Sequence, residues 1–529
     1  MGMTSRLKSR AWRAPLAVGL LQMSLYAAAA SPPSVEAIDA AVARTLETFA
    51  VPGMTVAVVH AGNVHHAAGY GIRDMHSELP VTAETLFQIG SVSKAFTAAS
   101  LALLVQEGKV GWDTPVIDYL PEFRMHDPWV TREFTVRDLL THRSGLPLGA
   151  GDLLMFPEGN ATRDEIIYAL RHLQPSSSFR SRYDYDNLLY IVAGEVVARV
   201  AGLPFEEFLE RRLLQPLNMD SCAATLERAA PKAAHATPHL LLEGELQVTR
   251  AGTTAVIAAA GGITCSAADM AKWMQMLLAG GALPDGTVLL EPEHFAELVR
   301  PVTLMSPPGY LVEHAGAHLS AYALGWNVST FDGELVLSHG GGLWGMTTFI
   351  ALLPERELAV FASNNLMSPA PRAIVNHILA ASIAGADTSP EADWIEIVAG
   401  LMSQRAADSE DTVATAAAAR AADSKPSLPL DRYAGRYRDP WYGEITITLK
   451  DDNTLWFDSS RNAPLSGPLE HFQYDTFVAR WTNRQLLADA YVSFTLDPQG
   501  GIERIRMQAV SPATDFSYDF HDLDLRPVE

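Results

Sequence analysis

The stretch QIGSVSKAFTAASLALLVQEGKV, residues 88–110, decides how the rest of the chain is interpreted. Lys94 follows Ser91 by three residues, at the start of an apolar run with helical spacing. Residues three apart on a helix share one face, so we expect the two side chains to be neighbours at a helix N-terminus. The pair is then either a capping serine beside a solvated lysine or an activated nucleophile.

Nucleophilic chemistry needs a lysine whose pKa is lowered, because a serine hydroxyl is weak until a base removes its proton. Burial without a carboxylate partner lowers that pKa, and no Asp or Glu lies between residues 88 and 105. The helix N-terminus also disfavours a cation and favours a developing oxyanion. The Ser-x-x-Lys pattern alone is weak, since a chance copy runs from Ser5 to Lys8.

Two later motifs favour the nucleophile. Tyr185-Asp186-Asn187 opens an apolar helix, and His339-Gly340-Gly341 lies on a strand before a Gly-rich turn. Each is weak alone, because Tyr-x-Asn is often a cap and His-Gly-Gly is often the end of a hairpin. Their ordered combination with Ser-x-x-Lys is a much stronger signal.

In this order the three motifs resemble those of the class C β-lactamase-related serine hydrolases. That family includes class C β-lactamases, D-alanyl-D-alanine carboxypeptidases, D-aminopeptidases and some carboxylesterases. The resemblance covers roughly residues 37–385, with Arg143 in TVRDLLTHRSGLP at a usual threonine and Cys265 in AAGGITCSAADMAKW at a usual serine. It implies a mixed α/β fold, a β-lactamase/transpeptidase-like domain with an antiparallel sheet flanked by helices.

The resemblance also implies catalytic roles. Ser91 would be the acylated nucleophile, and Lys94 and Tyr185 would share the proton transfers. Tyr185 would protonate the leaving group and activate the deacylating water. Asn187 would orient Lys94 and hold the substrate amide.

For substrate binding, the resemblance implies that His339, Gly340 and Gly341 form a strand edge along which the substrate lies. The backbone N–H groups of Ser91 and Gly342 would form the oxyanion hole. His339 occupies the position of a lysine in true class C β-lactamases, so the resemblance does not imply efficient β-lactamase activity.

The N-terminus has the pattern of a signal peptide. Basic residues between Arg6 and Arg13 precede a short apolar run that ends in Ala28–Ala30. The alternative is a buried N-terminal helix. We expect residues 1–30 to be removed, the protein to be periplasmic or secreted, and no integral membrane segment to remain after processing.

Three further regions follow. Residues 31–385 are the expected hydrolase domain, with a helix at 34–50, strands at both ends and a mostly helical middle at 110–335. Residues 386–428 are expected to be a linker, helical in part. Residues 429–529 show short alternating runs, FSYDFHDL at 516–523 among them, and predict an all-β lipocalin-like barrel. We expect this barrel to be separable from the chemistry and to shape access to the site or to form a homo-oligomer.

Composition excludes several functions. The formal net charge is −22 and no basic stripe is present, so we expect no nucleic-acid partner. No cofactor motif appears, and we expect no cofactor and no metal; His60, His65 and His66 fit a hairpin better than a metal site. The two cysteines can pair in an oxidising compartment, but two cysteines do not make a disulfide framework.

The sequence therefore predicts an exported serine hydrolase that forms an acyl-enzyme at Ser91. Its substrate would be a small ester, an amide or a D-amino-acid peptide, as in an esterase, a D-aminopeptidase or a D,D-carboxypeptidase, with weak β-lactamase activity at most. One alternative is a penicillin-binding protein that is acylated with little turnover. Another is an interaction protein in which the barrel carries the role and the N-terminal domain is inactive.

Overall fold

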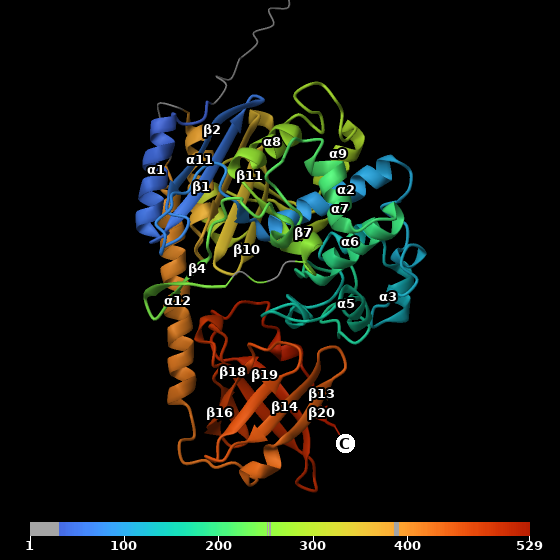
Figure 1. Ribbon diagram of the computed structural model, residues 1–529, viewed down its shortest axis with the longest axis vertical. Coiled ribbons are helices and arrows are strands. Elements are labelled where there is room, and N and C mark those ends of the chain that lie inside the picture. Colours follow the sequence, from blue (N-terminus) through green and yellow to red (C-terminus); the bar gives the residue numbers. More distant parts are fainter. Residues whose placement is uncertain (1–30, 251, 253–254, 386–390, 529) are drawn as a thin grey trace, which may run out of the picture.

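The computed structural model describes residues 31–250, 252, 255–385 and 391–528. The expected signal peptide, residues 1–30, lies outside the described residues. Figure 1 shows an N-terminal domain of helices and strands stacked on a C-terminal barrel, with the long helix α12 (Trp394–Ala418) running along one side of the molecule. The segment expected to be a partly helical linker is therefore largely one helix.

An eight-stranded sheet forms the centre of the N-terminal domain. Strand β1 pairs antiparallel with β12, with Val56 opposite Ala362, so strands from the two ends of the domain lie side by side. This confirms the predicted mixed fold. In spatial order the strands are β2 (Asn63–Gly71), β1 (Gly53–His60), β12 (Leu358–Asn364), β11 (Met346–Leu353), β10 (Glu334–Leu343), β9 (Asn327–Phe331), β8 (Ser320–Tyr322) and β7 (Thr303–Met305).

Helices cover both faces of this sheet, which explains why β1, β11 and β12 are buried along nearly their whole length. Helices α1 (Val35–Thr48) and α11 (Ala370–Ala384) pack on one face, in a cluster that contains Val56 and Val58. Helices α2 (Ser93–Gln106) and α8 (Ala267–Leu278) pack on the other, in a cluster that contains Ala57 and Val59. The hairpin of β1 and β2 carries His60, His65 and His66, and confirms the predicted hairpin.

The middle of the domain is less helical than predicted. Strands β7, β8 and β9 fall within residues 110–335, as do the hairpin β4 (His239–Leu242) and β5 (Glu245–Val248) and strand β6 (Thr264–Cys265), which pairs with β3 (Phe87–Gln88) from an earlier part of the chain. These strands are short, so they carry little period-two pattern for a sequence to display. Besides α8, the α-helices of this region are α3 (Pro128–Glu133), α4 (Val136–Leu139), α5 (Arg163–Ala169), α6 (Leu188–Ala201), α7 (Phe205–Leu209), α9 (Pro292–Val299) and α10 (Gly309–Ala315).

The C-terminal domain is a nearly closed antiparallel barrel, as predicted. Strand β20 pairs with β13, and a bridge between Ile505 and Leu525 brings β19 to the same place. The strands are β13 (Gly435–Asp439), β14 (Gly443–Leu449), β15 (Leu455–Ser459), β16 (Ser466–Gln473), β17 (Thr476–Ala479), β18 (Ala490–Leu496), β19 (Ile502–Ala509) and β20 (Arg526–Pro527).

The prediction of a strand at residues 516–523 is wrong. This segment is a loop with a short helical turn at Phe520–Asp522. Phe520 and Leu523 are buried in the barrel, whereas Asp519 binds backbone amides of the N-terminal domain. The alternation of aromatic and polar residues therefore does not mark the two faces of a strand: Phe520 and Leu523 pack in the barrel, whereas Phe516 and Asp519 contact the N-terminal domain.

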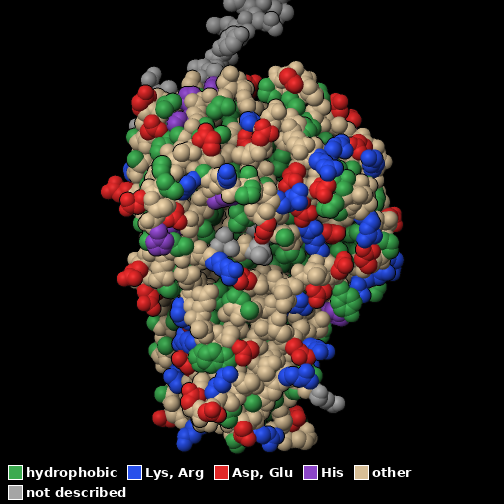
Figure 2. Space-filling model, in the orientation of Figure 1, with side chains coloured by type: hydrophobic (Ala, Val, Ile, Leu, Met, Phe, Trp, Pro, Cys, Tyr) green, Lys and Arg blue, Asp and Glu red, His purple; other side chains and the backbone are tan. Residues whose placement is uncertain are grey.

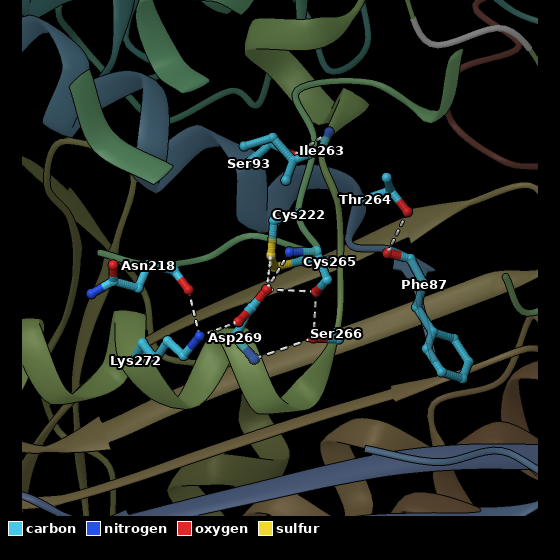
Figure 3. Close-up of a disulfide and its surroundings, with 11 residues drawn as sticks. Phe87, Ser93, Asn218, Cys222, Ile263, Thr264, Cys265, Ser266, Asp269 and Lys272 are labelled. Atoms are coloured by element: carbon cyan, nitrogen blue, oxygen red, sulfur yellow. Dashed lines mark hydrogen bonds and ion pairs between the residues drawn. A yellow bond between two sulfur atoms is a disulfide. The ribbon is translucent and has the colours of Figure 1, made fainter. Parts of the chain in front are cut away.

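Cys222 and Cys265 form a disulfide, with their Cα atoms 4.3 Å apart (Figure 3). The sequence left this pairing open. The bridge connects the loop after α7 to strand β6, next to Ser266, the N-cap of α8. Asp269 accepts a hydrogen bond from the backbone of Ser221 at 2.8 Å, so polar contacts brace the same corner.

The surface in Figure 2 carries acidic side chains interspersed with basic ones. Among the described residues, no single helix has both the length and the apolar composition needed to cross a bilayer. Helix α6 and the segment Phe205–Leu214 meet those criteria only together, as a pair bent by 75°.

Candidate active site

Ser91 lies in a short helical turn, Gly90–Val92, that leads directly into α2. The N-cap of α2 is Val92 and no side chain caps the helix, so Ser91 is not the capping serine of the alternative interpretation. Ser91 is partly exposed and lines a cleft of about 610 Å³. The residue that sequence reasoning placed at a helix N-terminus therefore faces open space.

Two glycines allow strand β10 to lie against this turn. Gly90 has φ +51°, and a Cβ there would lie 2.7 Å from the backbone nitrogen of Gly342. A Cβ on Gly341 would collide with the carbonyl oxygen of Ile89. Only glycine at both positions lets the backbones of Ser91 and Gly342 approach each other at the cleft.

Lys94 is fully buried, and its amine contacts the Ser91 hydroxyl. The Nζ–Oγ distance is 3.1 Å, and Nζ also donates to Asn187 Oδ1 at 2.7 Å and to the carbonyl oxygen of Ala260 at 2.8 Å. Burial lowers the pKa of Lys94 to about 7, although the charges of Asp152 and Asp186 oppose the change. Near neutral pH a large fraction of Lys94 is therefore an uncharged amine that can accept a proton.

Tyr185 and Asn187 come from the residues just before α6. Tyr185 and Ser91 line the same cleft, and Lys94 Nζ lies 4.8 Å from the centre of the Tyr185 ring. Burial raises the pKa of Tyr185 well above its ordinary value, so the phenol stays protonated and can donate. Asn187 is buried, and its Nδ2 donates to Asp152 Oδ2 at 2.8 Å.

His339 is buried on β10 and is uncharged. Its Nδ1 lies 2.6 Å from the carbonyl oxygen of Gly340, so Nδ1 carries the hydrogen, and Nε2 accepts from the Tyr322 hydroxyl at 2.9 Å. Burial lowers the pKa of His339 to about 3. The site therefore has no cation at the position where the resemblance gives true class C β-lactamases a lysine.

The strand edge expected for substrate is open. The pairing of β10 with β9 ends at Ser338 opposite Asn327, while the pairing with β11 continues to Leu343. Within the described part of the chain, residues 339–342 have no strand partner on the β9 side. His339, Gly340, Gly341 and Gly342 all line the cleft with Ser91, Tyr185 and Asn187.

Several residues at the site were not anticipated from the sequence. The barrel contributes Asp515, Phe516 and Ser517 to the wall of the cleft. The Phe516 ring meets the Tyr185 ring edge-on, with centroids 5.9 Å apart. Asp152 lies behind Asn187 and is fully buried. No local pattern marks these positions, because the partners of Asp152 lie 35 and 365 residues away in the sequence.

No three His, Cys, Asp or Glu side chains among the described residues gather in a way that would hold a metal ion. The donors around Ser91 are instead an amine, a phenol, a carboxamide and backbone amides. This set suits acyl transfer to a serine hydroxyl.

Comparison with known proteins agrees with this geometry. The Beta-lactamase family matches residues 38–385, and a domain of unknown function, DUF3471, matches residues 419–527. The chain is 30% identical over 484 residues to unguisins hydrolase ungD' of Aspergillus campestris (strain IBT 28561), which covers 87% of this chain and 86% of that relative.

Two solved structures share the fold. The octameric penicillin-binding protein homologue from Pyrococcus abyssi has a TM-score of 0.60 at 22% identity and covers 89% of this chain and 98% of its own. A class C beta lactamase from Rhodobacter sphaeroides has a TM-score of 0.54 at 22% identity and covers 66% of this chain and 99% of its own. Since the family match spans more than half of the chain, the protein belongs to the Beta-lactamase family of serine hydrolases.

Proposed function

We propose that the protein is exported, forms an acyl-enzyme at Ser91 and hydrolyses a small ester or amide. The observation that carries this proposal is the contact between the buried amine of Lys94 and the Ser91 hydroxyl, 3.1 Å apart. Within the described residues the amine has no direct hydrogen bond to a carboxylate, so the uncharged form is accessible near neutral pH.

In the acylation step, Lys94 Nζ takes the proton of Ser91 as Oγ bonds to the substrate carbonyl carbon. The carbonyl electron pair moves to oxygen, and the resulting oxyanion is held by the backbone N–H groups of Ser91 and Gly342. Each such donor contributes about 3 kcal/mol to transition-state stabilisation. The bond to the leaving group then breaks as Tyr185 protonates that group, and Tyr185 regains its proton from Lys94.

Deacylation reverses these roles. A water molecule gives a proton to Tyr185 while Tyr185 passes its own to Lys94, and the water oxygen attacks the acyl carbon. Collapse of the second tetrahedral intermediate releases the acid and returns the proton to Ser91 Oγ. Asn187 holds the amine through Oδ1 during both steps.

The substrate class follows from the walls of the cleft. The uncharged His339 offers no cation to a substrate carboxylate, so a carboxylate in the cleft would pair instead with Arg372 or Arg405, which also line it. Leu148, Phe156 and Phe516 give the cleft apolar surface beside the open edge of β10. We propose esters, amides or D-amino-acid peptides as substrates, and the hydrolase name of the Aspergillus campestris relative supports turnover.

Export is part of the proposal. The basic and apolar pattern of residues 1–30 supports it, and the Cys222–Cys265 disulfide suits an oxidising compartment. N-terminal sequencing of protein released by a bacterial host tests this. A mature chain that starts near Ser31 is expected, and an exported chain that starts at Met1 would contradict export.

The catalytic proposal is tested with a fluorophosphonate probe followed by a panel of p-nitrophenyl esters, D-amino-acid amides and nitrocefin. We expect labelling of wild type, no labelling of Ser91→Ala, and steady turnover of one of the first two classes. A burst without steady turnover would favour the second candidate, a penicillin-binding protein that is acylated and released slowly.

A homo-oligomer formed through the barrel remains a separate proposal. Its support is that the Pyrococcus abyssi homologue is described as octameric. Light scattering of the full chain tests it, and a monomer at working concentration would contradict it.

A further inference from the structure

A chain of hydrogen bonds runs from the catalytic lysine into the barrel. Lys94 Nζ donates to Asn187 Oδ1 at 2.7 Å, and Asn187 Nδ2 donates to Asp152 Oδ2 at 2.8 Å. The Ser517 hydroxyl, from the other domain, donates to the same Asp152 oxygen at 3.0 Å. The side chains of Asn187 and Asp152 thus connect the Lys94 amine to Ser517, which lies 365 residues beyond Asp152 in the sequence.

The barrel also holds the backbone around Asp152. The carboxyl group of Asp519 accepts from the amides of Gly151 at 2.6 Å and Leu153 at 2.9 Å, the residues on either side of Asp152. Asp519 is fully buried, so these contacts are shielded from water. Asn462, also in the barrel, donates to the carbonyl oxygen of Leu153 at 3.0 Å.

The orientation of the Asn187 amide matters for the base. A carboxamide presents an acceptor at one end and donors at the other, and the two ends have almost the same shape. With the oxygen toward Lys94 the contact is favourable, whereas a flipped amide would direct N–H groups at the amine. The acceptor at Asp152 fixes the first arrangement, because it binds the Nδ2 end.

We propose that Asp152 and Ser517 are positioning residues, which together hold the Asn187 amide with its oxygen toward Lys94. The barrel is then part of the catalytic apparatus through Ser517 and Asp519, although neither touches the reacting atoms. This inference rests on the proposed role of Lys94 as the base.

The charged groups around Lys94 decide whether loss of the Ser517 hydrogen bond raises or lowers the pKa of Lys94. The titratable groups near Lys94 are Asp152, Asp186, His142, His339, Tyr185 and Tyr190, and those near Asp152 are Lys94, Asp515 and Asp519. Burial raises the pKa of Asp152 to about 8, and the Ser517 hydrogen bond opposes this change. Loss of that hydrogen bond leaves less carboxylate beside Lys94, so the pKa of Lys94 falls.

The test compares the full-length variants Ser517→Ala and Asp152→Asn with wild type. We expect kcat/KM on a p-nitrophenyl ester to fall about tenfold for Ser517→Ala and further for Asp152→Asn, since a positioning hydrogen bond is lost. We also expect the acid limb of the kcat/KM profile to move to lower pH in both variants, by about half a unit for Ser517→Ala. A purely structural role would not move that limb.

The matched control is Ser511→Ala, in the same loop. The Ser511 hydroxyl contacts Ser409 at 2.8 Å and does not contact Asp152. This variant is expected to keep both the rate and the profile of wild type.

An unmoved acid limb in both Ser517→Ala and Asp152→Asn would overturn the inference, whatever their rates. Fluorophosphonate labelling of wild type at Ser91 is measured in parallel. Failure of that labelling would contradict the proposed function, so the two failures are distinguishable.

Discussion

Two segments meet at the cleft, and they are held there in different ways. The nucleophile segment enters α2, whose residues from Ser93 to Leu104 are all buried, so core packing fixes Ser91 and Lys94. The barrel segment 515–519 is a loop, held by the hydrogen bonds of Ser517 and Asp519 and by the edge-on contact of Phe516 with Tyr185.

This difference means that core packing and the contacts from the barrel control different properties of the catalytic groups. Apolar packing around α2 sets the position of Lys94 and, through desolvation, lowers its pKa. The polar contacts from the barrel act on the next layer, Asp152 and the loop that carries it. We therefore expect changes in the first segment to abolish chemistry and changes in the second to reduce and retune it.

The largest effect on the labelling rate is expected for Lys94→Arg, a change within the nucleophile segment. Arginine is effectively never deprotonated, and its planar group does not fit a pocket built for an amine, so it cannot act as the base. We expect the fluorophosphonate labelling rate to fall at least about a hundredfold. Lys272→Arg is the control, because Lys272 is a partly exposed lysine on α8 that pairs with Asp269 away from the cleft. If Lys94→Arg is labelled at a rate within a few-fold of wild type, Lys94 is not the base, and the Ser-x-x-Lys pattern only marks the start of a helix.

Removal of the barrel tests how much the barrel segment contributes to the reaction at Ser91. A chain that ends at Ala418 keeps α12, whose Trp394 is buried in the N-terminal core. It lacks Ser517, Phe516 and Asp519, so the loop around Asp152 loses its anchors. We expect a circular dichroism spectrum of a folded domain and labelling reduced by between about tenfold and a hundredfold. Labelling equal to that of the full chain would mean that the barrel is separable from the chemistry, as the sequence alone had predicted.

The smallest effect on labelling is expected for the double variant Cys222→Ser, Cys265→Ser. The bridge closes a loop with a sequence separation of 43, and its loss should cost about 2–4 kcal/mol of unfolding free energy. Urea denaturation measures this cost. The labelling rate should stay within a few-fold of wild type, because the bridge does not touch the cleft. A loss of more than about tenfold would show that segment 258–265, which carries the Ala260 acceptor of Lys94, depends on the bridge.

The sequence predicts the parts of the fold and site that are local. Helix periodicity places α1 and α2, and period-two alternation places most of the barrel strands. The three motifs bring Ser91, Tyr185, Asn187 and His339 to one cleft, with Lys94 buried against Ser91, because each motif is short and marks the start of a helix or the edge of a strand.

The rest depends on contacts between distant residues. Asp152 is one of many acidic residues in the sequence, and only the tertiary structure shows that it lies behind Asn187. The segment 516–523 alternates like a strand, yet Ser517 and Asp519 bind the other domain. The short strands β7, β8 and β9 complete the sheet at its edge and have too few residues to show a period.

The central claim is that Lys94, uncharged by burial, is the base that activates Ser91. The most direct measurement is the rate of fluorophosphonate labelling of wild type from pH 5 to 9, with the modified residue identified by peptide mass spectrometry. We predict an adduct on Ser91 and a rate that rises with pH through an inflection near the pKa of Lys94, about 7, because only the unprotonated amine can accept the serine proton. An adduct on another residue, or a rate at Ser91 that does not change over this range, would contradict the account.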